Sequence, residues 1–545
     1  FLSHFDGANN GDNNAFIDGH DTSNPHTITA NGNVTQGSFG PFARPDGEWG
    51  VSFDGTDLLR SASSNEIEFG TGDFTIEFFA YHRSTTDYIT TCTSRDSVGS
   101  VANGDFWTEG GANFNRISFK NDSGTTTQLN DASGPYPVGQ WFHVAAVKEG
   151  SALTYYRDGA RIVTASVSGT FGRNNAQISF GKFPDHTLFY WDGYISNFRI
   201  LKGTAQYSGA TYTVPTSPLT AVTNTSLLTC QSNRFVDNSS NGHAITPTGA
   251  PAVSAFGPFL TSAVYDAAVN GASAFFDGDN DYLSTGDSAD FVLGDTFTLE
   301  AWVYPTVSES NDYPMIMSQA EGYPTGWYFS LRSTNEVNFY LNAADNAGGA
   351  IDLNTDGSDP VQLNAWNHIA LSVSSGTGYI YVNGARKSSA ATGINNNLDR
   401  SGTTFRVGVI NAAGSYDFDG YICDARIVKG TALYSGTTYT VPTAPLTAIT
   451  NTKLLLNMSN GQAIDNSAQN NLTLYGTAKL STGQAKFGNT SLLLDGNSDY
   501  AKTSGYVGSI LGGKTIECWV YASSISSLMC VWEWYEDNNN LLRLY

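Results

Sequence analysis

Recurring carboxylates and histidines are the residues in this chain that could support catalysis. Glu77, Glu300 and Glu517 occupy the same place in three similar apolar stretches. Retaining glycoside hydrolysis needs two carboxyl groups about 5 Å apart, one as acid and one as nucleophile. The position two residues after each glutamate is aromatic, so the strand offers one carboxylate instead of a pair. We therefore interpret these glutamates as structural and the chain as non-enzymatic.

Two histidines also recur, His143 in Trp-Phe-His-Val-Ala and His368 in Trp-Asn-His-Ile-Ala. A histidine base activates a Ser or Cys nucleophile, and no such nucleophile recurs beside either of them. We interpret both as structural side chains that bridge neighbouring strands.

Acidic loops are the candidate metal sites. Asp18, Asp237 and Asp465 follow a short apolar strand at the start of each repeat. Carboxylate oxygens are ligands that Ca²⁺ prefers. The alternative is an Asx turn, in which the carboxylate accepts hydrogen bonds from nearby backbone N–H groups without metal.

Aromatic side chains in less regular regions are candidates for stacking on sugar rings, although most aromatic residues of a sandwich belong to its core. The candidates differ between the repeats, which argues against one shared sugar site. They are Trp107 and residues 189–192 in the first repeat, and Trp327, Tyr416 and Phe418 in the second.

A long internal repeat must position these residues. Residues 193–209 return as 420–436, and Tyr212 returns as Tyr439, an offset of 227. A repeat of this length is a whole domain and not a solenoid unit. We expect domains at 1–222 and 223–450, and the first part of a third at 451–545. The chain starts without Met and stops inside the third copy, so both ends are expected to lie within a longer polypeptide.

Each repeat reads as a series of strands joined by turns. The strongest strand, 74–81 or 297–304, carries large side chains on both faces and is expected at the centre of a sheet; 515–521 is expected to match it. Asp158-Gly159 and Asn383-Gly384 suit two-residue hairpins. The prediction is an all-β protein of tandem antiparallel β-sandwich domains.

Bulk composition excludes several partners. With 27 Lys and Arg against 50 Asp and Glu, the net charge of −23 opposes nucleic acid binding. No run of 18 apolar residues is present, so membrane insertion is not expected. The five cysteines do not recur between repeats, which indicates free thiols; a hairpin disulfide between Cys518 and Cys530 is the alternative.

The ordered motifs resemble the laminin-G-like, concanavalin A-like jelly-roll family. The narrower stretch 227–240 is similar to linkers in structural proteins of marine bacteriophages, cyanophages especially. The motifs that carry the family resemblance are Phe-Asp-Gly at 276–278, Asp-Tyr-Leu at 281–283, the strand 297–304, Trp-x-His-Ile-Ala at 366–370, Val-Asn-Gly at 382–384 and Gly-Tyr-Ile at 420–422.

The resemblance implies a Ca²⁺ site between the early acidic loop and the closing strand. Family members carry two acidic residues after Gly-x-Ile in that strand. This chain has Asn197 in the first repeat and Asp424 in the second, so at least one carboxylate of the family pattern is missing.

The resemblance also implies a non-enzymatic viral structural protein, a tail-fibre or capsid-appendage segment at the virion surface. Tandem lectin-like domains would bind a host surface glycan or protein receptor and other virion subunits, and a homo-oligomer fits such appendages. The alternative is a secreted or surface-anchored bacterial adhesin or carbohydrate-binding array, extracellular or at the cell surface.

Overall fold

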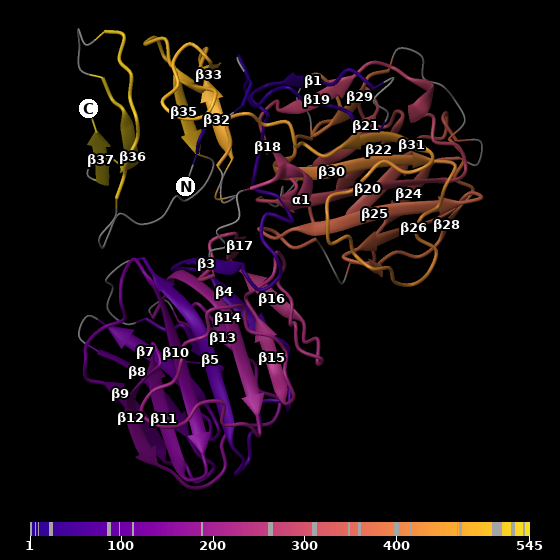
Figure 1. Cartoon of the computed structure of the whole chain (residues 1–545). Coiled ribbons are helices and arrows are strands. Elements are labelled where there is room, and N and C mark those ends of the chain that lie inside the picture. The colour runs from indigo at the N-terminus through magenta and orange to yellow at the C-terminus, as the bar shows by residue number, and fades with distance from the viewer. Residues whose placement is uncertain are drawn as a thin grey trace.

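The chain folds almost entirely into antiparallel β-sheets (Figure 1). This computed structural model describes 37 strands, with one short α-helix, α1 (Ala267–Asn270), and one 3-10 turn, η1 (Ala289–Phe291). The all-β prediction is confirmed. The structure describes all residues except 1–2, 6, 9, 21–24, 84–88, 98, 112–113, 187–188, 260–264, 308–312, 347–348, 358–360, 397–402, 414–415, 466, 468–470, 504–514, 525–528, 538–539 and 545.

The first sandwich, called sandwich one, packs an eight-stranded sheet on a seven-stranded sheet. The eight-stranded sheet has the order β12 (Ala160–Ser166), β11 (Ala152–Arg157), β10 (Trp141–Glu149), β5 (Phe74–His82), β14 (Asp192–Lys202), β3 (Gly50–Asp54) and β17 (Ala252–Ser254), with β15 (Thr225–Thr229) also on β14. The other has the order β16 (Ile245–Thr248), β4 (Leu58–Ser61), β13 (Ser179–Phe180), β6 (Cys92–Thr93), β7 (Phe106–Gly111), β8 (Phe114–Lys120) and β9 (Thr126–Asp131).

Sandwich two repeats this plan with a nine-stranded and a seven-stranded sheet. The larger sheet has the order β2 (Thr35–Gly37), β18 (Ser273–Asp277), β30 (Asp419–Lys429), β20 (Phe297–Pro305), β25 (Asn367–Ser374), β26 (Thr377–Val382) and β27 (Ala385–Arg386), with β28 (Ala391–Thr392) on β26 and β31 (Thr452–Leu456) on β30. The smaller has the order β1 (Thr29–Asn31), β19 (Tyr282–Thr285), β29 (Phe405–Val407), β21 (Met315–Gln319), β22 (Trp327–Leu331), β23 (Val337–Leu341) and β24 (Ile351–Asn354).

The predicted central strands, β5 and β20, lie at the middle of their sheets. Every residue of both strands is buried. Their alternate side chains face the opposite sheet, where Phe74 lies 5.5 Å from Phe119 and Phe297 lies 6.0 Å from Phe339 between ring centroids. The remaining side chains point to the outer face, where loops cover them. Burial on both faces explains why these strands carry large side chains at nearly every position.

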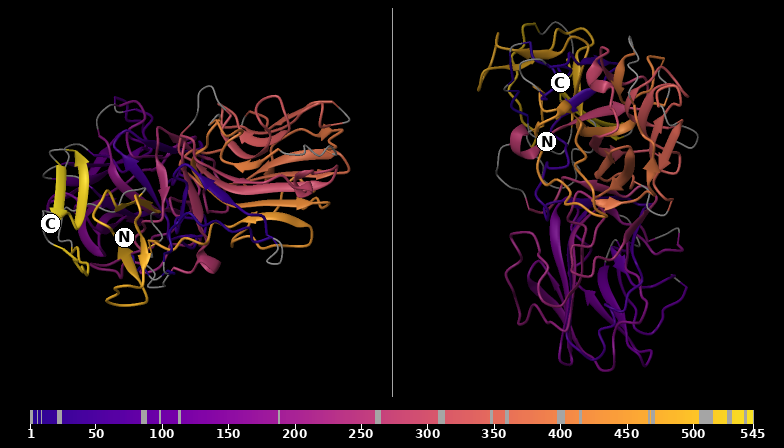
Figure 2. Two further views of the ribbon diagram at one scale, coloured as in Figure 1. Left: turned by 90° about the horizontal axis from the view of Figure 1, so that it is seen from above. Right: turned by 90° about the vertical axis from the view of Figure 1, so that its right-hand side faces the viewer.

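The two sandwiches are assembled across the boundaries of the sequence repeat. Strands β15, β16 and β17 come from the second repeat but pair with β14, β4 and β3 of sandwich one. Strands β1 and β2 come from the first repeat but pair with β19 and β18 of sandwich two. The boundaries at 222 and 450 therefore describe the repeat in the sequence, whereas the sheets combine segments of different copies (Figure 2).

The first strand of the third repeat, β31, joins sandwich two, and the described residues after it form three separate two-stranded ribbons. They pair β32 (Leu472–Tyr475) with β35 (Tyr500–Thr503), β33 (Lys479–Ser481) with β34 (Ser491–Leu493), and β36 (Trp532–Asp537) with β37 (Asn540–Leu544). The expectation of a strand at 515–521 is wrong, because these residues are exposed and outside every sheet. Strand β5 is held by β10 and β14, and the described residues after 521 include no counterpart of either.

All five cysteines are free, and the alternative of a Cys518–Cys530 disulfide is not observed. Cys92, Cys230 and Cys423 are buried, as expected for thiols that replace small core residues. Within the described ranges, no helix is long and apolar enough to cross a membrane.

Candidate functional site

Glu77 lies on the outer face of sandwich one in a fully occupied polar cluster. Arg199 donates to Glu77 Oε1 from Nε at 2.9 Å and from a terminal nitrogen at 2.7 Å. Tyr207 donates to Oε2 at 2.6 Å, and His143 Nε2 lies 3.4 Å from that oxygen. Tyr212 holds the other ring nitrogen of His143 at 2.7 Å. Burial alone would raise the pKa of Glu77, but these partners together lower it.

Sandwich two repeats the cluster around Glu300. Arg426 donates twice to Oε1, at 2.9 and 2.7 Å, and Tyr434 donates to Oε2 at 2.7 Å. His368 Nε2 lies 3.3 Å from Oε2, and Tyr439 contacts the other nitrogen of His368. Burial opposes ionisation here too, yet His368 and Arg426 lower the pKa of Glu300 to about 2.

These clusters explain why Glu77, Glu300, His143 and His368 recur. Each carboxylate is ionised, buried and fully engaged by an arginine, a tyrosine and a histidine. Such a group can neither deliver a proton nor approach a substrate. The structural interpretation of the recurring Glu and His residues is supported by these contacts.

The early acidic loops fold into Asx turns at the seam with a neighbouring strand. Asp237 Oδ1 accepts from the backbone N–H groups of Leu228 and Ser239 at 3.0 and 2.9 Å. Its Oδ2 accepts from the N–H of His243 at 2.9 Å. Asp465 similarly accepts from the N–H of Ser467 at 2.9 Å.

The closing-strand positions Asn197 and Asp424 are also engaged by the protein. Both lie at positive φ, 52° and 53°, at the irregular point of β14 and β30. Asn197 Oδ1 accepts from the N–H of Leu219 at 2.8 Å, and Asp424 Oδ2 accepts from the N–H of Leu446 at 3.0 Å. Burial raises the pKa of Asp424 to about 6.

The structure does not bring the acidic loop of a repeat together with the closing strand of the same repeat. Asp18 contacts β31 of sandwich two, the sandwich of Asp424, whereas Asp237 contacts β15 of sandwich one, the sandwich of Asn197. The oxygens of Asp237 face N–H donors, which repel a cation. These contacts favour the Asx turn without metal, and Ca²⁺ binding stays a prediction that a titration with a thermal melt can test.

His20, which has no histidine counterpart in the second repeat, joins Asp18 and His26 in the one cluster of potential metal ligands among the described residues. His20 Nδ1 lies 2.5 Å from Asp18 Oδ2, which also accepts from the N–H of His26 at 3.2 Å. His26 Nε2 lies 3.1 Å from the carbonyl oxygen of Lys453. The ligand atoms thus already contact protein groups at the seam between the first repeat and β31.

A cleft of about 610 Å³ opens on the outer face of sandwich one, beside the Glu77 cluster. Its floor is formed by β5 and β10, and its rim by the linker 214–218 and by Pro258 and Phe259. Aromatic groups lie together with acidic ones in this cleft. They are Phe79, Trp141, Phe142 and Phe259, with Glu48 and Asp158.

Glu48 Oε2 and Trp141 Nε1 are buried in this cleft without a hydrogen-bond partner. His143 Nε2, also buried in the lining, faces the Glu77 carboxylate at 3.4 Å. Glu48 is only 7% exposed, and burial raises the pKa of its carboxyl group, with Arg44 opposing the rise. An unpaired buried carboxylate oxygen costs free energy unless a ligand or water satisfies it. The cleft therefore has an acceptor and an aromatic N–H donor available to a bound molecule.

The same place in sandwich two is closed. Trp366, the counterpart of Trp141, is fully buried, and Gly271 stands where sandwich one has Glu48. A Cβ added at Gly271 would lie 3.1 Å from Phe42 and 3.3 Å from Pro445, so little room remains. The candidate site is therefore a property of sandwich one.

Most aromatic residues singled out in the sequence are core residues. Trp107, Trp191, Trp327 and Phe418 are at most 5% exposed, and Tyr416 is half-buried. The cleft aromatics Trp141 and Phe259 were missed, because each belongs to a repeated motif that reads as core. A lone signal was available, since Glu48 has no acidic counterpart in the second repeat.

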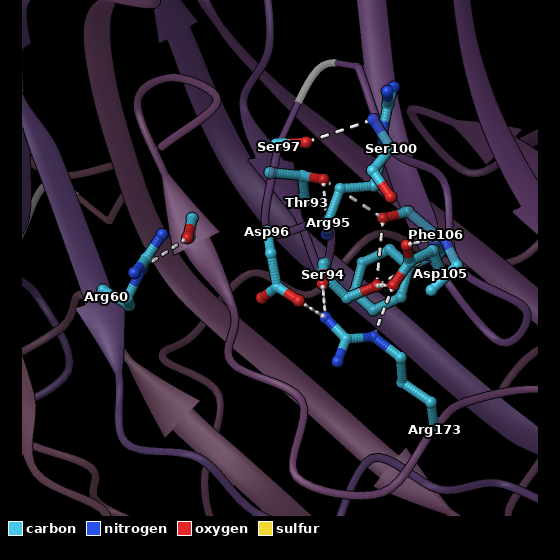
Figure 3. A network of polar contacts seen from close by, with 12 residues as sticks. Arg60, Thr93, Ser94, Arg95, Asp96, Ser97, Ser100, Asp105, Phe106 and Arg173 are labelled. Carbon is cyan, nitrogen blue, oxygen red and sulfur yellow. Dashed lines mark hydrogen bonds and ion pairs between the residues drawn. The ribbon is translucent and has the colours of Figure 1, made fainter. Parts of the chain in front are cut away.

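A second polar network joins the loop after β6 to the turn at Arg173 (Figure 3). Arg173 Nε donates to Asp105 Oδ1 at 2.7 Å, and a terminal nitrogen donates to Asp96 Oδ2 at 2.7 Å and to the carbonyl oxygen of Ser94 at 2.9 Å. Asp105 Oδ2 also accepts from the N–H of Ala102 at 2.7 Å. Because the carboxylate oxygens and the guanidinium are engaged, we interpret this network as a structural clamp.

The chain matches one family over more than half of its length. The family described as the concanavalin A-like lectin/glucanases superfamily matches residues 53–206 and 277–433. No curated protein matches the chain.

Several solved structures are similar to parts of the chain at low identity. Domains LG4-5 of the mouse laminin alpha1 chain are 11% identical, covering 72% of this chain and 94% of that one, with a TM-score of 0.23. The Ruminococcus gnavus IT-sialidase CBM40 bound to alpha2,3 sialyllactose is 15% identical over 26% and 84%, with a TM-score of 0.21. The native heptameric SAP-like pentraxin from Limulus polyphemus is 15% identical over 30% and 79%, with a TM-score of 0.23.

Proposed function

The chain belongs to the concanavalin A-like lectin/glucanases superfamily, and from this membership we propose that it is a non-catalytic glycan-binding array. The Trp141 cleft of sandwich one is the proposed saccharide site. The second sandwich, whose equivalent place is closed, acts in this proposal as a rigid neighbour that positions the first.

The observation that carries the proposal is the unpaired Glu48 oxygen beside Trp141 in a cleft of about 610 Å³. Ligand sites combine apolar and aromatic walls with a few placed polar groups. A sugar offers C–H groups to the rings of Trp141 and Phe259. Its hydroxyl groups can donate to Glu48 and accept from Trp141 Nε1.

The arrangement of carboxylates favours binding over hydrolysis. Asp158 lies in the β11–β12 turn, at φ 48°, and its Oδ1 accepts from the N–H of His143 at 2.8 Å. Glu48 is then the cleft carboxylate with an unpaired oxygen. Hydrolysis needs a matched acid and nucleophile or base.

Lectin-like and laminin G-like domains are typical of extracellular or surface proteins, which fits a carbohydrate-binding array. Linked domains raise the effective concentration of weak sites for a surface that displays many glycans. A virion location, in a tail fibre or capsid appendage with other virion subunits, stays a prediction from the resemblance. Identifying the genes beside the coding sequence would test it.

A glycan array probed with the whole chain tests the function. We expect binding to at least one saccharide, followed by calorimetry with that saccharide on Trp141→Phe and Glu48→Gln. Loss of the carboxylate should weaken binding at least tenfold, because a charged hydrogen bond contributes about 1.5–3 kcal/mol. The matched control is Glu68→Gln, an exposed carboxylate of the same sandwich. Unchanged affinity in Glu48→Gln would contradict the proposed site.

A further inference from the structure

The first two repeats exchange their opening segments, defined as residues 16–42 and 235–259. Residues 16–42 complete sandwich two through the β1–β19 and β2–β18 pairs. Residues 235–259 complete sandwich one through the β16–β4 and β17–β3 pairs. The registers correspond, since Thr29 lies opposite Ser284 as Thr246 lies opposite Arg60.

The aspartate near the start of each opening segment makes the same contact in the sandwich that the segment completes; we call this residue the acidic cap. Asp18 Oδ1 accepts from the N–H of Leu455 at 3.0 Å, and Asp237 Oδ1 accepts from the N–H of Leu228 at 3.0 Å. Leu455 and Leu228 are equivalent residues of β31 and β15. Each sandwich therefore binds the aspartate of its opening segment through an equivalent backbone N–H group.

Each segment also ends in a Phe-Gly-Pro-Phe motif that inserts an aromatic plug. Phe39 lies in a cage of Tyr304, Trp366 and Tyr421, with ring centroids 5.5, 5.7 and 5.0 Å away. Phe39 is 7% exposed, so this plug is an anchor of the segment in sandwich two.

The plug of the other segment is caged in the same way. Phe256 lies 5.0, 5.4 and 4.9 Å from the ring centroids of Tyr81, Trp141 and Tyr194. These three residues are the counterparts of the sandwich-two cage. The strand pairs, the acidic cap and the plug thus make the same set of contacts in both sandwiches, so either segment has the features that a groove binds.

Sandwich two has a second possible occupant in the same chain. Residues 463–488 directly follow β31, as residues 235–259 directly follow β15, but their strands β32 and β33 pair within the third repeat. Phe487, at the plug position, is 69% exposed. The groove of sandwich two is thus filled by a segment hundreds of residues away in sequence while the adjacent segment stays outside it.

We propose that residues 16–42 complete sandwich two of a second copy of this chain, so that copies associate by exchanging opening segments. Every contact of the segment with the groove is available in trans, because the groove recognises backbone, Asp18 and Phe39 and not chain connectivity. Residues 43–49 link the segment to sandwich one, and exchange of an identical element between copies through such a short connection is a low-cost route to dimers.

Disulfide trapping between two copies tests the exchange. Thr29→Cys in one protein and Ser284→Cys in the other place thiols on directly opposite residues, whose Cβ atoms lie about 4.5–5.5 Å apart in an antiparallel pair. Both proteins carry Cys518→Ser and Cys530→Ser to remove the exposed thiols. After co-refolding and oxidation of the mixture, we expect a covalent dimer on a non-reducing gel.

The matched control is the equivalent pair of sandwich one, Thr246→Cys and Arg60→Cys. Its segment directly follows β15 of the same sandwich, so the mixed single variants should stay monomeric. The proposal is overturned if the Thr29→Cys and Ser284→Cys mixture stays monomeric while the double variant in one chain forms its disulfide. It is also overturned if that double variant forms no disulfide at all, because the pairing itself would then be refuted.

Discussion

At the scale of single residues, the chain places its strongest charges where they hold strands together. The Glu77 and Glu300 clusters each bury an ion pair on the outer face of a central strand. A buried pair contributes little over an apolar pair, but removal of one partner leaves the other charge uncompensated. Removal of one member of a cluster should therefore lower the stability of the protein.

We predict that Arg199→Ala destabilises the protein by about 3–5 kcal/mol, because it leaves the Glu77 carboxylate buried without its cation. Urea unfolding followed by tryptophan fluorescence measures the change. The control is Arg161→Ala, which removes an exposed arginine of the same sandwich. Equal stability of the two variants would refute this account of the cluster.

The sequence alone predicts part of this cluster and misses the rest. Lone carboxylates on an apolar strand already indicate a structural role for Glu77. Its partners Arg199 and Tyr207 stand 122 and 130 residues away, so only the fold brings them together. No local pattern marks a contact at that separation.

A second residue-scale prediction concerns Asp424, whose place in sandwich one is held by the neutral Asn197. The pKa of Asp424 is raised from 3.8 to about 6, so the folded chain binds more protons than the unfolded chain between these values. Stability therefore falls as pH rises through this window, by about 3 kcal/mol in total.

Asp424→Asn removes this titration. We expect the melting temperature of the variant relative to the native protein to rise between pH 4 and pH 6 and to stay constant above pH 7. Calorimetric melts across this range measure the difference. Parallel melting curves at all pH values would show that Asp424 does not carry the dependence.

At the scale of elements, the recurring Gly-Tyr-Ile motif has a steric reason. Gly420 is the second residue of β30 and has a φ of 134°. A Cβ added at this position would lie 2.1 Å from the carbonyl oxygen of Tyr304. Only glycine allows the closing strand to approach β20 so closely. The motif thus fixes the pairing of β30 and β20, the two longest strands of sandwich two.

We predict that Gly420→Ala costs about 1–3 kcal/mol, because the backbone must shift to relieve the clash. The control is Gly286→Ala, whose added Cβ meets nothing within 4 Å. Thermal melts of both variants give the comparison. A Gly420→Ala protein as stable as the control would mean that the strands can separate at no cost.

Strands that carry large side chains on both faces could be predicted from the sequence. Whether such a segment forms a strand also depends on neighbouring strands, and this could not be predicted. Strands β5 and β20 follow from continuous large side chains, and the Asp158-Gly159 and Asn383-Gly384 turns carry positive φ values as expected for such hairpins. Residues 515–521 have the same pattern but pair with no strand among the described residues, and they remain exposed. Pattern gives a preference for a strand, and pairing decides whether it forms.

At the scale of the whole molecule, the sequence repeat predicts two similar sandwiches but does not predict which opening segment completes each of them. Similar copies predict similar sandwiches, and the shared plan of sandwich one and sandwich two agrees with this. The same similarity makes the opening segments interchangeable, so no sequence feature tells which groove each will fill. The exchange across the repeat boundaries is therefore a finding of the structure.

The junction of the two sandwiches carries the last prediction. Phe39 contacts the sandwich-two cage and also Trp49 of sandwich one, with ring centroids 6.3 Å apart. Tyr304 of sandwich two donates to the carbonyl oxygen of Val253 in β17 at 3.3 Å. Rings shared by two bodies couple their unfolding, because opening one exposes the core of the other.

We expect the two sandwiches to unfold in one calorimetric transition in the native protein and in two in Phe39→Ala, with a loss of about 3–5 kcal/mol from the truncated core side chain. Phe487→Ala is the control, since this plug counterpart is exposed and its loss should leave one transition. Two transitions in the native protein would show that the junction does not couple the bodies. A single transition in Phe39→Ala would show that the coupling runs through the backbone contacts of β17 and not through the aromatic cage.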